Sequence, residues 1–229
     1  MGPGDWLSKS LEFATLFNKF NLMTIWEIHP VNPDQRKINQ VVQAIETGQI
    51  GIFPTDSVYG LACLANNRHG IERICQIKHV KPEKELFSLL CRDIQQVSAF
   101  TRQIDNAIFR VIRRHVPGPY TFILNANSEL PKIIKNRKGT IGMRVPNNAI
   151  LQAILAQLSL PLITTSVKQN VDEDWDTYYV DPYDLRMDYE HVVDFMVDGG
   201  PGNAEASTVL DCTGDAIQVI RQGIGVLDL

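Results

Sequence analysis

The chain alternates short continuous apolar segments with longer segments whose apolar residues recur at helical spacing. The clearest helical segment has apolar residues at i, i+3, i+4 and i+7, namely Ile38, Val41, Val42 and Ile45. We expect Asn32 to cap this helix, with Pro33 at its first position, and Gly48 to end it. The apolar segment 50–53 follows and predicts a buried strand. This alternation restricts the chain to folds in which helices pack on a sheet.

The same pattern continues along the chain. Further helices are expected over residues 69–78, 104–115 and 149–158, and after Asp93. Further strands are expected at residues 86–91, 120–125, 139–145, 161–166, 192–197, 207–212 and 216–222. The sequence therefore predicts one α/β domain with a twisted, mostly mixed or antiparallel sheet flanked by helices.

The first residues of the chain differ from the rest. Residues 1–22 show only a weak amphipathic pattern, and Met23 could itself be a translation start. We interpret residues 1–22 as an N-terminal extension without an assigned role, with a helix packed on the domain surface as the alternative. The domain then comprises residues 23–229.

The composition is typical of a soluble globular protein, with 44% hydrophobic and 21% charged residues among 229. No apolar segment approaches the ~18 residues needed to span a bilayer, so no membrane partner is expected. Residues 1–26 lack the basic start and apolar centre of a secretory signal. The four cysteines have no CxxC spacing and are interpreted as buried free thiols, which predicts a cytoplasmic location. The five histidines show no metal-binding spacing, so no metal site is expected.

Charge is unevenly distributed. The net charge is −4, but residues 171–198 hold ten of the 26 acidic residues and only one of the 22 basic residues. The rest of the chain carries a net charge of +5, so a local basic face is compatible with the acidic pI of 5.7. An acidic loop is expected at residues 171–184, and its Trp175 and Tyr178-Tyr179 could cover a ligand or pack on the surface.

Polar residues lie at the ends of three predicted strands, in the segments PTDSVYGL, PLITTS and DGG: Thr55, Asp56 and Ser57, then Thr165 and Ser166, then Asp198, Gly199 and Gly200. Strand ends of open α/β sheets meet at a crevice, where hydroxyls can donate hydrogen bonds to a carboxylate or phosphate. The alternative for each residue alone is a turn cap. The glycine-rich phosphate loops and the G-x-S-x-G hydrolase motif are absent from the sequence.

Three cationic residues are candidates for binding an anion. Arg144 lies in the apolar strand predicted at 139–145, so its guanidinium would be partly buried and would need an anionic partner. That partner is either a structural carboxylate or a substrate carboxylate or phosphate. Lys78 ends a predicted helix, where a solvated lysine is also favourable. Arg221 lies on a late predicted strand and has the same two interpretations as Arg144.

Together these segments resemble the YrdC-like domain, which defines the L-threonylcarbamoyladenylate synthase family. The resemblance covers about residues 28–224 and rests on segments in the family's order: PTDSVYGL, the helix ending at Lys78, PGPYTFIL, TIGMRVP, PLITTS, DGG, STVLD and RQG. The opening segment IHPVNPDQRKINQ is most similar to the YciO branch. The resemblance implies a single YrdC-like domain with a large central cleft.

The resemblance also implies a reaction, in which family members join L-threonine, bicarbonate and ATP into threonylcarbamoyl-AMP and release pyrophosphate. The product supplies the threonylcarbamoyl group of a modified tRNA adenosine. By resemblance Lys78 and Ser166 are catalytic, and Ser57, Arg144 and Ser207 bind L-threonine. The residues expected near the nucleotide are Lys78, Lys84, Thr140, Ser166 and Arg221. ATP would be a substrate accompanied by Mg²⁺, with no tightly bound metal or organic cofactor.

Two positions depart from the synthase pattern. Val80 stands where the synthases carry arginine in Lys-x-Arg-Pro, and Lys168 stands where they carry asparagine in Ser-x-Asn-x-Ser-Gly. Valine cannot neutralise a phosphate, and loss of one preorganised charge contact commonly costs ~100-fold in rate. Lys84 or Lys168 could substitute, but an ammonium does not replace a guanidinium fork. We therefore expect reduced synthase activity.

A second hypothesis is a protein that binds double-stranded RNA or tRNA without synthase activity. The family is associated with such binding through a basic concave surface, for which the candidate residues are Arg113, Arg114, Lys135, Arg137 and Lys138. The alternative is two solvated basic faces, which the net charge of −4 favours. A third hypothesis is a related carbamoyl- or adenylyl-transfer enzyme that acts on another small molecule. The sequence leaves the substrate and the oligomeric state open.

Overall fold

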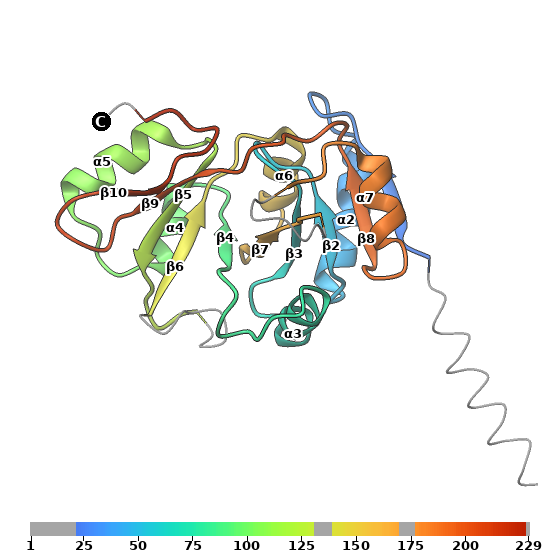
Figure 1. Cartoon of the computed structure of the whole chain (residues 1–229), viewed down its shortest axis with the longest axis horizontal. Helices are drawn as coiled ribbons and strands as arrows, with labels where there is room; N and C mark the ends of the chain where they lie inside the picture. Colours follow the sequence, from blue (N-terminus) through green and yellow to red (C-terminus); the bar gives the residue numbers. More distant parts are fainter. Residues whose placement is uncertain (1–21, 131–138, 170–176, 228–229) are drawn as a thin grey trace, which may run out of the picture.

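The computed structural model describes residues 22–130, 139–169 and 177–227, and within them the strands form one ten-stranded mixed sheet (Figure 1). The strands are β1 (Thr24–Glu27), β2 (Gly51–Phe53), β3 (Gly60–Leu64), β4 (Ser88–Leu90), β5 (Tyr120–Asn125), β6 (Thr140–Arg144), β7 (Leu162–Ser166), β8 (Phe195–Asp198), β9 (Thr208–Asp211) and β10 (Gln218–Arg221). They lie in the order β1-β8-β2-β3-β7-β4-β6-β5-β9-β10. Parallel and antiparallel pairs both occur, so the predicted mixed sheet of an α/β domain is confirmed.

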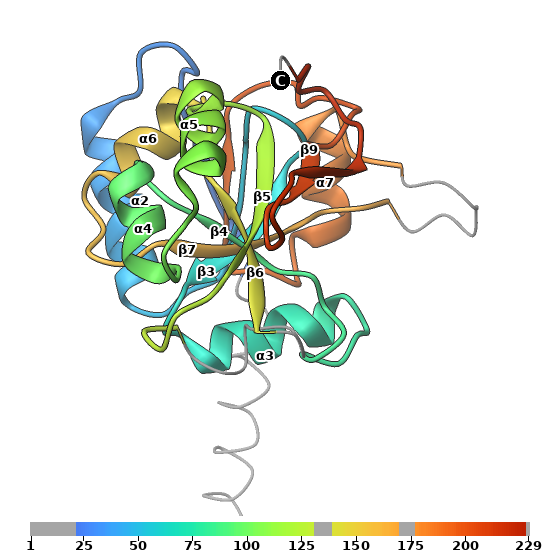
Figure 2. The same ribbon diagram turned by 90° about the vertical axis from the view of Figure 1, so that its left-hand side faces the viewer.

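The helices are α2 (Gln35–Glu46), α3 (Arg68–Ile77), α4 (Ile94–Phe100), α5 (Asn106–His115), α6 (Ala149–Leu155) and α7 (Pro182–Tyr189). Figure 2 shows α2, α4, α5 and α6 on one side of the strands and α7 on the other. As predicted, Asp93 caps α4, because its side chain accepts a hydrogen bond from the backbone N of Gln96. Gly48, with a φ of 90°, follows the end of α2 as predicted. None of the described helices is long and apolar enough to cross a membrane.

The start of α2 differs from the prediction. Asp34 rather than Asn32 caps the helix, because its carboxylate accepts hydrogen bonds from the backbone N of Arg36 and Lys37. The backbone N of Asn32 instead donates to the ring of His29, 3.1 Å away. The residues before Asp34 therefore form a separate turn.

The pattern of apolar residues did not reveal β1, β3 or α7. Strand β3 lies inside the sheet and pairs antiparallel with both β2 and β7. Helix α7 begins within the expected acidic loop 171–184. The prediction of a loop is therefore wrong from Pro182 onward. Asp181 caps α7 and Pro182 lies in its first turn. Residues 170–176 of that loop, and all of the expected extension 1–22 except Leu22, lie outside the described residues.

Two large apolar clusters make up most of the core. In β2, Ile52 belongs to the first cluster and Phe53 to the second, and in β3 Leu61 and Ala62 divide in the same way. Because successive strand residues point to opposite faces, the clusters cover the two faces of this part of the sheet. As predicted, the cysteines are buried free thiols: Cys63, Cys75, Cys91 and Cys212.

Candidate functional site

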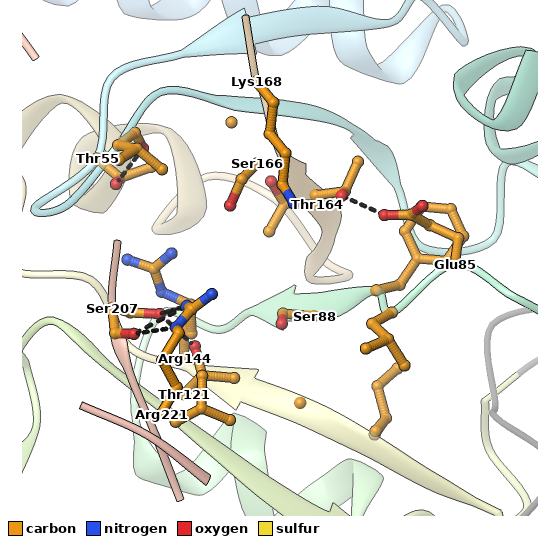
Figure 3. Close-up of a pocket in the computed structure, with 18 of the residues that line it drawn as sticks. Thr55, Glu85, Ser88, Thr121, Arg144, Thr164, Ser166, Lys168, Ser207 and Arg221 are labelled. Atoms are coloured by element: carbon orange, nitrogen blue, oxygen red, sulfur yellow. Dashed lines mark hydrogen bonds between the residues drawn. The ribbon is translucent and has the colours of Figure 1, made fainter. Parts of the chain in front are cut away.

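A cavity of about 540 Å³ opens at the centre of the sheet. Its wall is built from β3, β4, β5, β6, β7, β9 and β10, the loop before β3 and the loop after α3. Figure 3 shows hydroxyl groups and cations directed into it, from residues that include Thr55, Ser88, Thr121, Arg144, Thr164, Ser166, Lys168, Ser207 and Arg221. The cavity therefore combines hydrogen-bond donors with positive charge, which suits a small anionic ligand.

Arg144, the last residue of β6, is 6% exposed on the cavity wall. Its Nη2 donates to Asp56 Oδ1 at 2.8 Å and to Ser57 Oγ at 2.9 Å. Its Nε has no hydrogen-bond partner within the part of the chain that the structure describes. Burial lowers the pKa of the guanidinium, and the carboxylate of Asp56 opposes that shift. Arg144 is thus a buried cation on the cavity wall that is paired with Asp56.

The polar turn after β2 fixes the partners of Arg144. Thr55 Oγ1 donates to the backbone O of Val58 at 2.7 Å and accepts from the backbone N of Ser57 at 2.9 Å. Asp56 Oδ2 accepts from the backbone N of Asn147 at 2.8 Å, which joins the turn to the residues after β6. This segment therefore both forms a turn and supplies a charge partner. Of the two partners predicted for Arg144, a structural carboxylate or a ligand, the structure shows a structural carboxylate, that of Asp56.

Arg221 approaches the same side of the cavity from β10. Its Nη2 donates to the backbone O of Ser207 at 2.9 Å, and its Nε donates to the same oxygen at 3.2 Å. The hydroxyl of Ser207 lies 2.8 Å from Thr121 Oγ1. The charge of Arg221 also contributes to lowering the pKa of Arg144, so the two guanidinium groups lie within electrostatic reach of each other (Figure 3). We call Arg144, Ser207 and Arg221 the arginine corner.

The opposite side of the cavity carries Lys78, which follows the last residue of α3. Its Nζ lies 2.8 Å from Glu85 Oε1 and 2.6 Å from Thr165 Oγ1, and it also donates to the backbone O of Ser166 at 3.4 Å. The side chain of Lys78 is only 20% exposed and that of Glu85 only 10%. Lys78 is therefore a paired, largely buried cation rather than a solvated lysine at a helix end.

The structure brings together nearly all of the residues predicted for the site. Those that line the cavity are Lys78, Lys84, Thr140, Arg144, Ser166, Ser207 and Arg221. The two departures from the synthase pattern, Val80 and Lys168, line it as well. Of the three polar strand ends, the first contributes Thr55 to the wall and the second contributes Thr165 and Ser166.

Two expectations about the cavity differ from the structure. Ser57 is fully buried behind Arg144 and does not line the cavity, so its hydroxyl supports the guanidinium instead of facing a substrate. The Asp198-Gly199-Gly200 segment does not line the cavity either. The backbone O of Gly200 accepts a hydrogen bond from Tyr59 at 2.7 Å, which gives this segment a structural contact.

Two carboxylates of the site were not predicted from the sequence. Asp56 was recognised only as a polar residue at a strand end, and Glu85 was not singled out. Asp56 pairs with Arg144, 88 residues away, so no local spacing could have revealed that pair. Glu85 pairs with Lys78, seven residues away, and this pairing depends on how the loop after α3 folds back. The one available signal was that Arg144, in an apolar strand, needed an anionic partner.

The remaining predicted residues lie elsewhere. Arg113 and Arg114 are exposed in the last turn of α5 and do not line the cavity. The other candidates for RNA binding, Lys135, Arg137 and Lys138, lie outside the described residues, as does Trp175. Tyr178 lines the cavity, whereas the hydroxyl of Tyr179 donates to Asp188 Oδ2 at 2.6 Å. Among the described residues no group of three His, Cys, Asp or Glu side chains could hold a metal ion.

Residues 43–223 match the Sua5/YciO/YrdC family model, which carries the description "Telomere recombination". The chain belongs to this family. The uncharacterized protein YciO of Escherichia coli K12 is 39% identical over 199 residues, which cover 86% of this chain and 94% of the relative. The putative threonylcarbamoyl-AMP synthase of Methanocaldococcus jannaschii is 29% identical over 204 residues, which cover 87% of this chain and 93% of the relative.

Solved structures give the same result for this Sua5/YciO/YrdC protein. The crystal structure of E. coli YciO matches with a TM-score of 0.82 and 37% identity, over 90% of this chain and 98% of that chain. The crystal structure of P. abyssi Sua5 complexed with L-threonine shares the fold, with a TM-score of 0.79 and 21% identity over 88% of this chain and 58% of that chain. The protein is therefore a YciO-type homologue related to the threonylcarbamoyl-AMP synthases.

Proposed function

We propose that this YciO-type protein binds L-threonine and ATP and forms threonylcarbamoyl-AMP from L-threonine, bicarbonate and ATP, for modification of a tRNA adenosine. The activity is expected to be lower than that of the synthases. The observation that supports the proposal most directly is the arginine corner. It places two guanidinium groups beside hydroxyls in a cavity of suitable size for small substrates.

The arginine corner suits the carboxylate of L-threonine. Arg144 is neutralised by Asp56, but Arg221 adds a further positive charge, and Nε of Arg144 has no partner among the described residues. A carboxylate bound beside the two guanidinium groups would balance the second charge. The hydroxyls of Thr121 and Ser207 are close enough to contact the polar groups of the same ligand. The binding of L-threonine by P. abyssi Sua5 is consistent with this assignment.

The opposite side of the cavity is the proposed position of the nucleotide. Lys78, Lys84 and Lys168 line it, and they supply positive charge for the phosphates of ATP, which would arrive with Mg²⁺. Thr140 and Ser166 add hydroxyl groups to the wall. In the proposed reaction the amine of threonine combines with bicarbonate to a carbamate and releases water. A carbamate oxygen then attacks the α-phosphorus of ATP, and the bond to the departing pyrophosphate breaks.

The expected low rate has a physical reason in the wall of the cavity. Val80 lines the side that would face the phosphates, and its apolar side chain offers neither charge nor hydrogen bond to the developing negative charge. Lys168 also lines the cavity, as a flexible ammonium where the synthases carry an amide. Each change removes a rigid contact that would stabilise the transition state, and we expect ATP binding itself to be retained.

Pyrophosphate release at high enzyme concentration tests the proposal. Release should require L-threonine and bicarbonate together, and omission of either should abolish it. Arg221→Met should lower the release, because it removes a charge of the arginine corner, whereas Arg186→Met on the exposed side of α7 should not. No release above a protein-free control, with ATP binding intact, would refute the synthase assignment.

A second candidate function is binding of double-stranded RNA or tRNA. It is favoured by the basic last turn of α5, where Arg113 and Arg114 are exposed next to His115. Such binding should weaken steeply with salt, because phosphate contacts release counterions. A gel shift with tRNA at low salt, compared between the protein and an Arg113→Glu/Arg114→Glu variant, tests it. An unshifted tRNA at low salt would exclude this function.

A third candidate remains an enzyme that transfers a carbamoyl or adenylyl group to another small molecule. The arginine corner is proposed to bind a carboxylate, so other amino acids are also candidate ligands. A thermal-shift screen of amino acids, each with and without ATP, compares them directly. Stabilisation by L-threonine alone among them supports the first candidate.

A further inference from the structure

The ammonium group of Lys78 has all of its hydrogen-bonding capacity engaged. Its three N–H donors face three oxygen atoms, those of Glu85 Oε1, Thr165 Oγ1 and the backbone of Ser166, at 2.8, 2.6 and 3.4 Å. The hydroxyl of Thr165 in turn donates to Glu85 Oε1. The side chains of Lys78, Thr165 and Glu85 close a triangle of hydrogen bonds inside the cavity.

This triangle holds a carboxylate where a negatively charged ligand would otherwise meet Lys78. Glu85 is the only acidic side chain among the described residues that line the cavity, and it is 10% exposed. A phosphate that approached Lys78 would meet both an occupied donor and the repulsion of a second negative charge. To contact the ammonium directly, it must displace Glu85.

The surroundings of Glu85 allow such a displacement. Glu85 belongs to the loop between α3 and β4, and its neighbours Lys84 and Leu86 are exposed. Thr165, in contrast, belongs to β7, where it pairs with Leu61 of β3. A displacement of Glu85 would therefore leave Lys78 with its contacts to Thr165 and Ser166 on the sheet.

We propose that Glu85 is an internal counter-ion of Lys78 that sets the affinity of the cavity for phosphate groups. A polyphosphate binds Lys78 only after its own charge has replaced the carboxylate of Glu85. The side chain thus selects against weakly charged ligands and favours ligands with several negative charges. This inference deepens the proposed function and rests on it in one respect, namely that the side of the cavity near Lys78 takes a phosphate-bearing ligand.

Isothermal titration with inorganic pyrophosphate and with tripolyphosphate tests the inference. Glu85→Gln keeps the size of the side chain and removes its charge, so affinity should rise about tenfold as the competing carboxylate disappears. Glu83→Gln is the matched control, because Glu83 is exposed in the same loop and does not line the cavity. It should raise affinity by less than about twofold, since an exposed charge is screened.

A second pair of variants tests whether the gain in pyrophosphate affinity depends on Lys78. Lys78→Met should bind pyrophosphate weakly, and adding Glu85→Gln to it should recover only part of the tenfold gain, because the repulsion is relieved but no cation is released. Unchanged melting temperatures in the absence of ligand would show that the variants are folded. Equal affinities of Glu85→Gln and Glu83→Gln would overturn the inference, as would a full gain in the Lys78→Met background.

The outcomes separate this inference from the proposed function. Pyrophosphate binding requires neither L-threonine nor bicarbonate, so a tenfold gain in Glu85→Gln supports the counter-ion role even if no threonylcarbamoyl-AMP forms. Conversely, the unmodified protein could show synthase activity while Glu85→Gln shows no gain in pyrophosphate affinity. This result would support the proposed reaction and refute the role of Glu85.

Discussion

The guanidinium of Arg144 and the carboxylate of Asp56 form a 2.8 Å ion pair in which each side chain is 7% exposed. The pair joins the turn after β2 to the end of β6, two segments that are 88 residues apart in the chain. Because burial lowers the pKa of Arg144, the carboxylate is needed to keep the cation stable in this position. The pair therefore contributes to both the fold and the charge of the cavity.

Removing one partner of the Arg144–Asp56 pair should lower the stability of the protein. We expect Asp56→Ala to lower the free energy of unfolding by about 3–5 kcal/mol, because it leaves a buried guanidinium without its counter-charge. Urea unfolding followed by circular dichroism measures the change. Glu72→Gln, which breaks the exposed pair between Arg68 and Glu72, should cost less than about 1 kcal/mol. A loss below about 1 kcal/mol for Asp56→Ala would contradict the structural role of the pair.

Local pattern predicted the regular parts of the fold and missed the irregular ones. The segment 120–125 matches β5 because it alternates apolar residues within sharp turn boundaries. Helix α7 could not be predicted, because Leu185 is its only buried residue and the others follow no apolar periodicity. Strand β3 was hidden because Gly60–Leu64 continues the apolar run of the segment before it, so the boundary depends on pairing with β2 and β7.

The same distinction holds for the site. Arg144 could be predicted because a guanidinium in an apolar strand demands an anion, whatever the fold. Its partner Asp56 could not, since that pair depends on how segments 88 residues apart meet. The Lys78–Glu85 pair could not either, because it depends on how the loop after α3 folds back onto Lys78. Ser57 was predicted to bind the substrate, and this prediction is wrong. The sequence does not show that Ser57 is buried against Arg144.

Ser207 is expected to contribute to the affinity of the cavity for L-threonine. Its hydroxyl contacts Thr121, while its backbone O holds Arg221, so Ser207→Ala removes only the hydroxyl of the arginine corner. We expect the dissociation constant for L-threonine to rise about fivefold, the value of one net hydrogen bond. Titration calorimetry measures it, with Ser98→Ala on the exposed face of α4 as the control. Equal affinities of the two variants would remove Ser207 from the proposed binding site.

Gly142 is required by the close packing of β6 beneath the cavity. A Cβ at this position would lie 2.6 Å from Ser88 Oγ and 2.9 Å from Thr121 Cγ2, so both side chains would have to move. We expect Gly142→Ala to cost about 1–3 kcal/mol of unfolding free energy and to weaken L-threonine binding through Thr121. Gly214→Ala, where a Cβ would meet nothing within 4 Å, is the matched control.

The double variant Gly142→Ala/Ser88→Ala tests the cause of this cost. Removing the hydroxyl of Ser88 makes room for the new methyl group, so part of the lost stability should return. If the double variant lost more unfolding free energy than the two single variants together, crowding against Ser88 would not explain the cost of Gly142→Ala.

The buried thiol of Cys63 should make stability depend on alkaline pH. Burial raises its pKa from 9.0 to about 12, with a smaller contribution from the neighbouring Cys75. The unfolded chain loses this proton near pH 9 while the folded chain retains it, so the folded state binds more protons between pH 9 and 12. The free energy of unfolding must therefore fall as pH rises through this range, and the contribution of Cys63 is fully present below pH 9.

Cys63→Ala isolates this contribution from that of other groups that titrate in the same range. Between pH 8.5 and 10.5, guanidinium unfolding should show a shallower decline for Cys63→Ala than for the unmodified protein, by up to about 1.4 kcal/mol per pH unit. Val42→Ala also truncates a buried side chain but has no proton to lose, so it should lower stability equally at every pH. Parallel declines of Cys63→Ala and the unmodified protein would show that the thiol does not titrate differently in the two states.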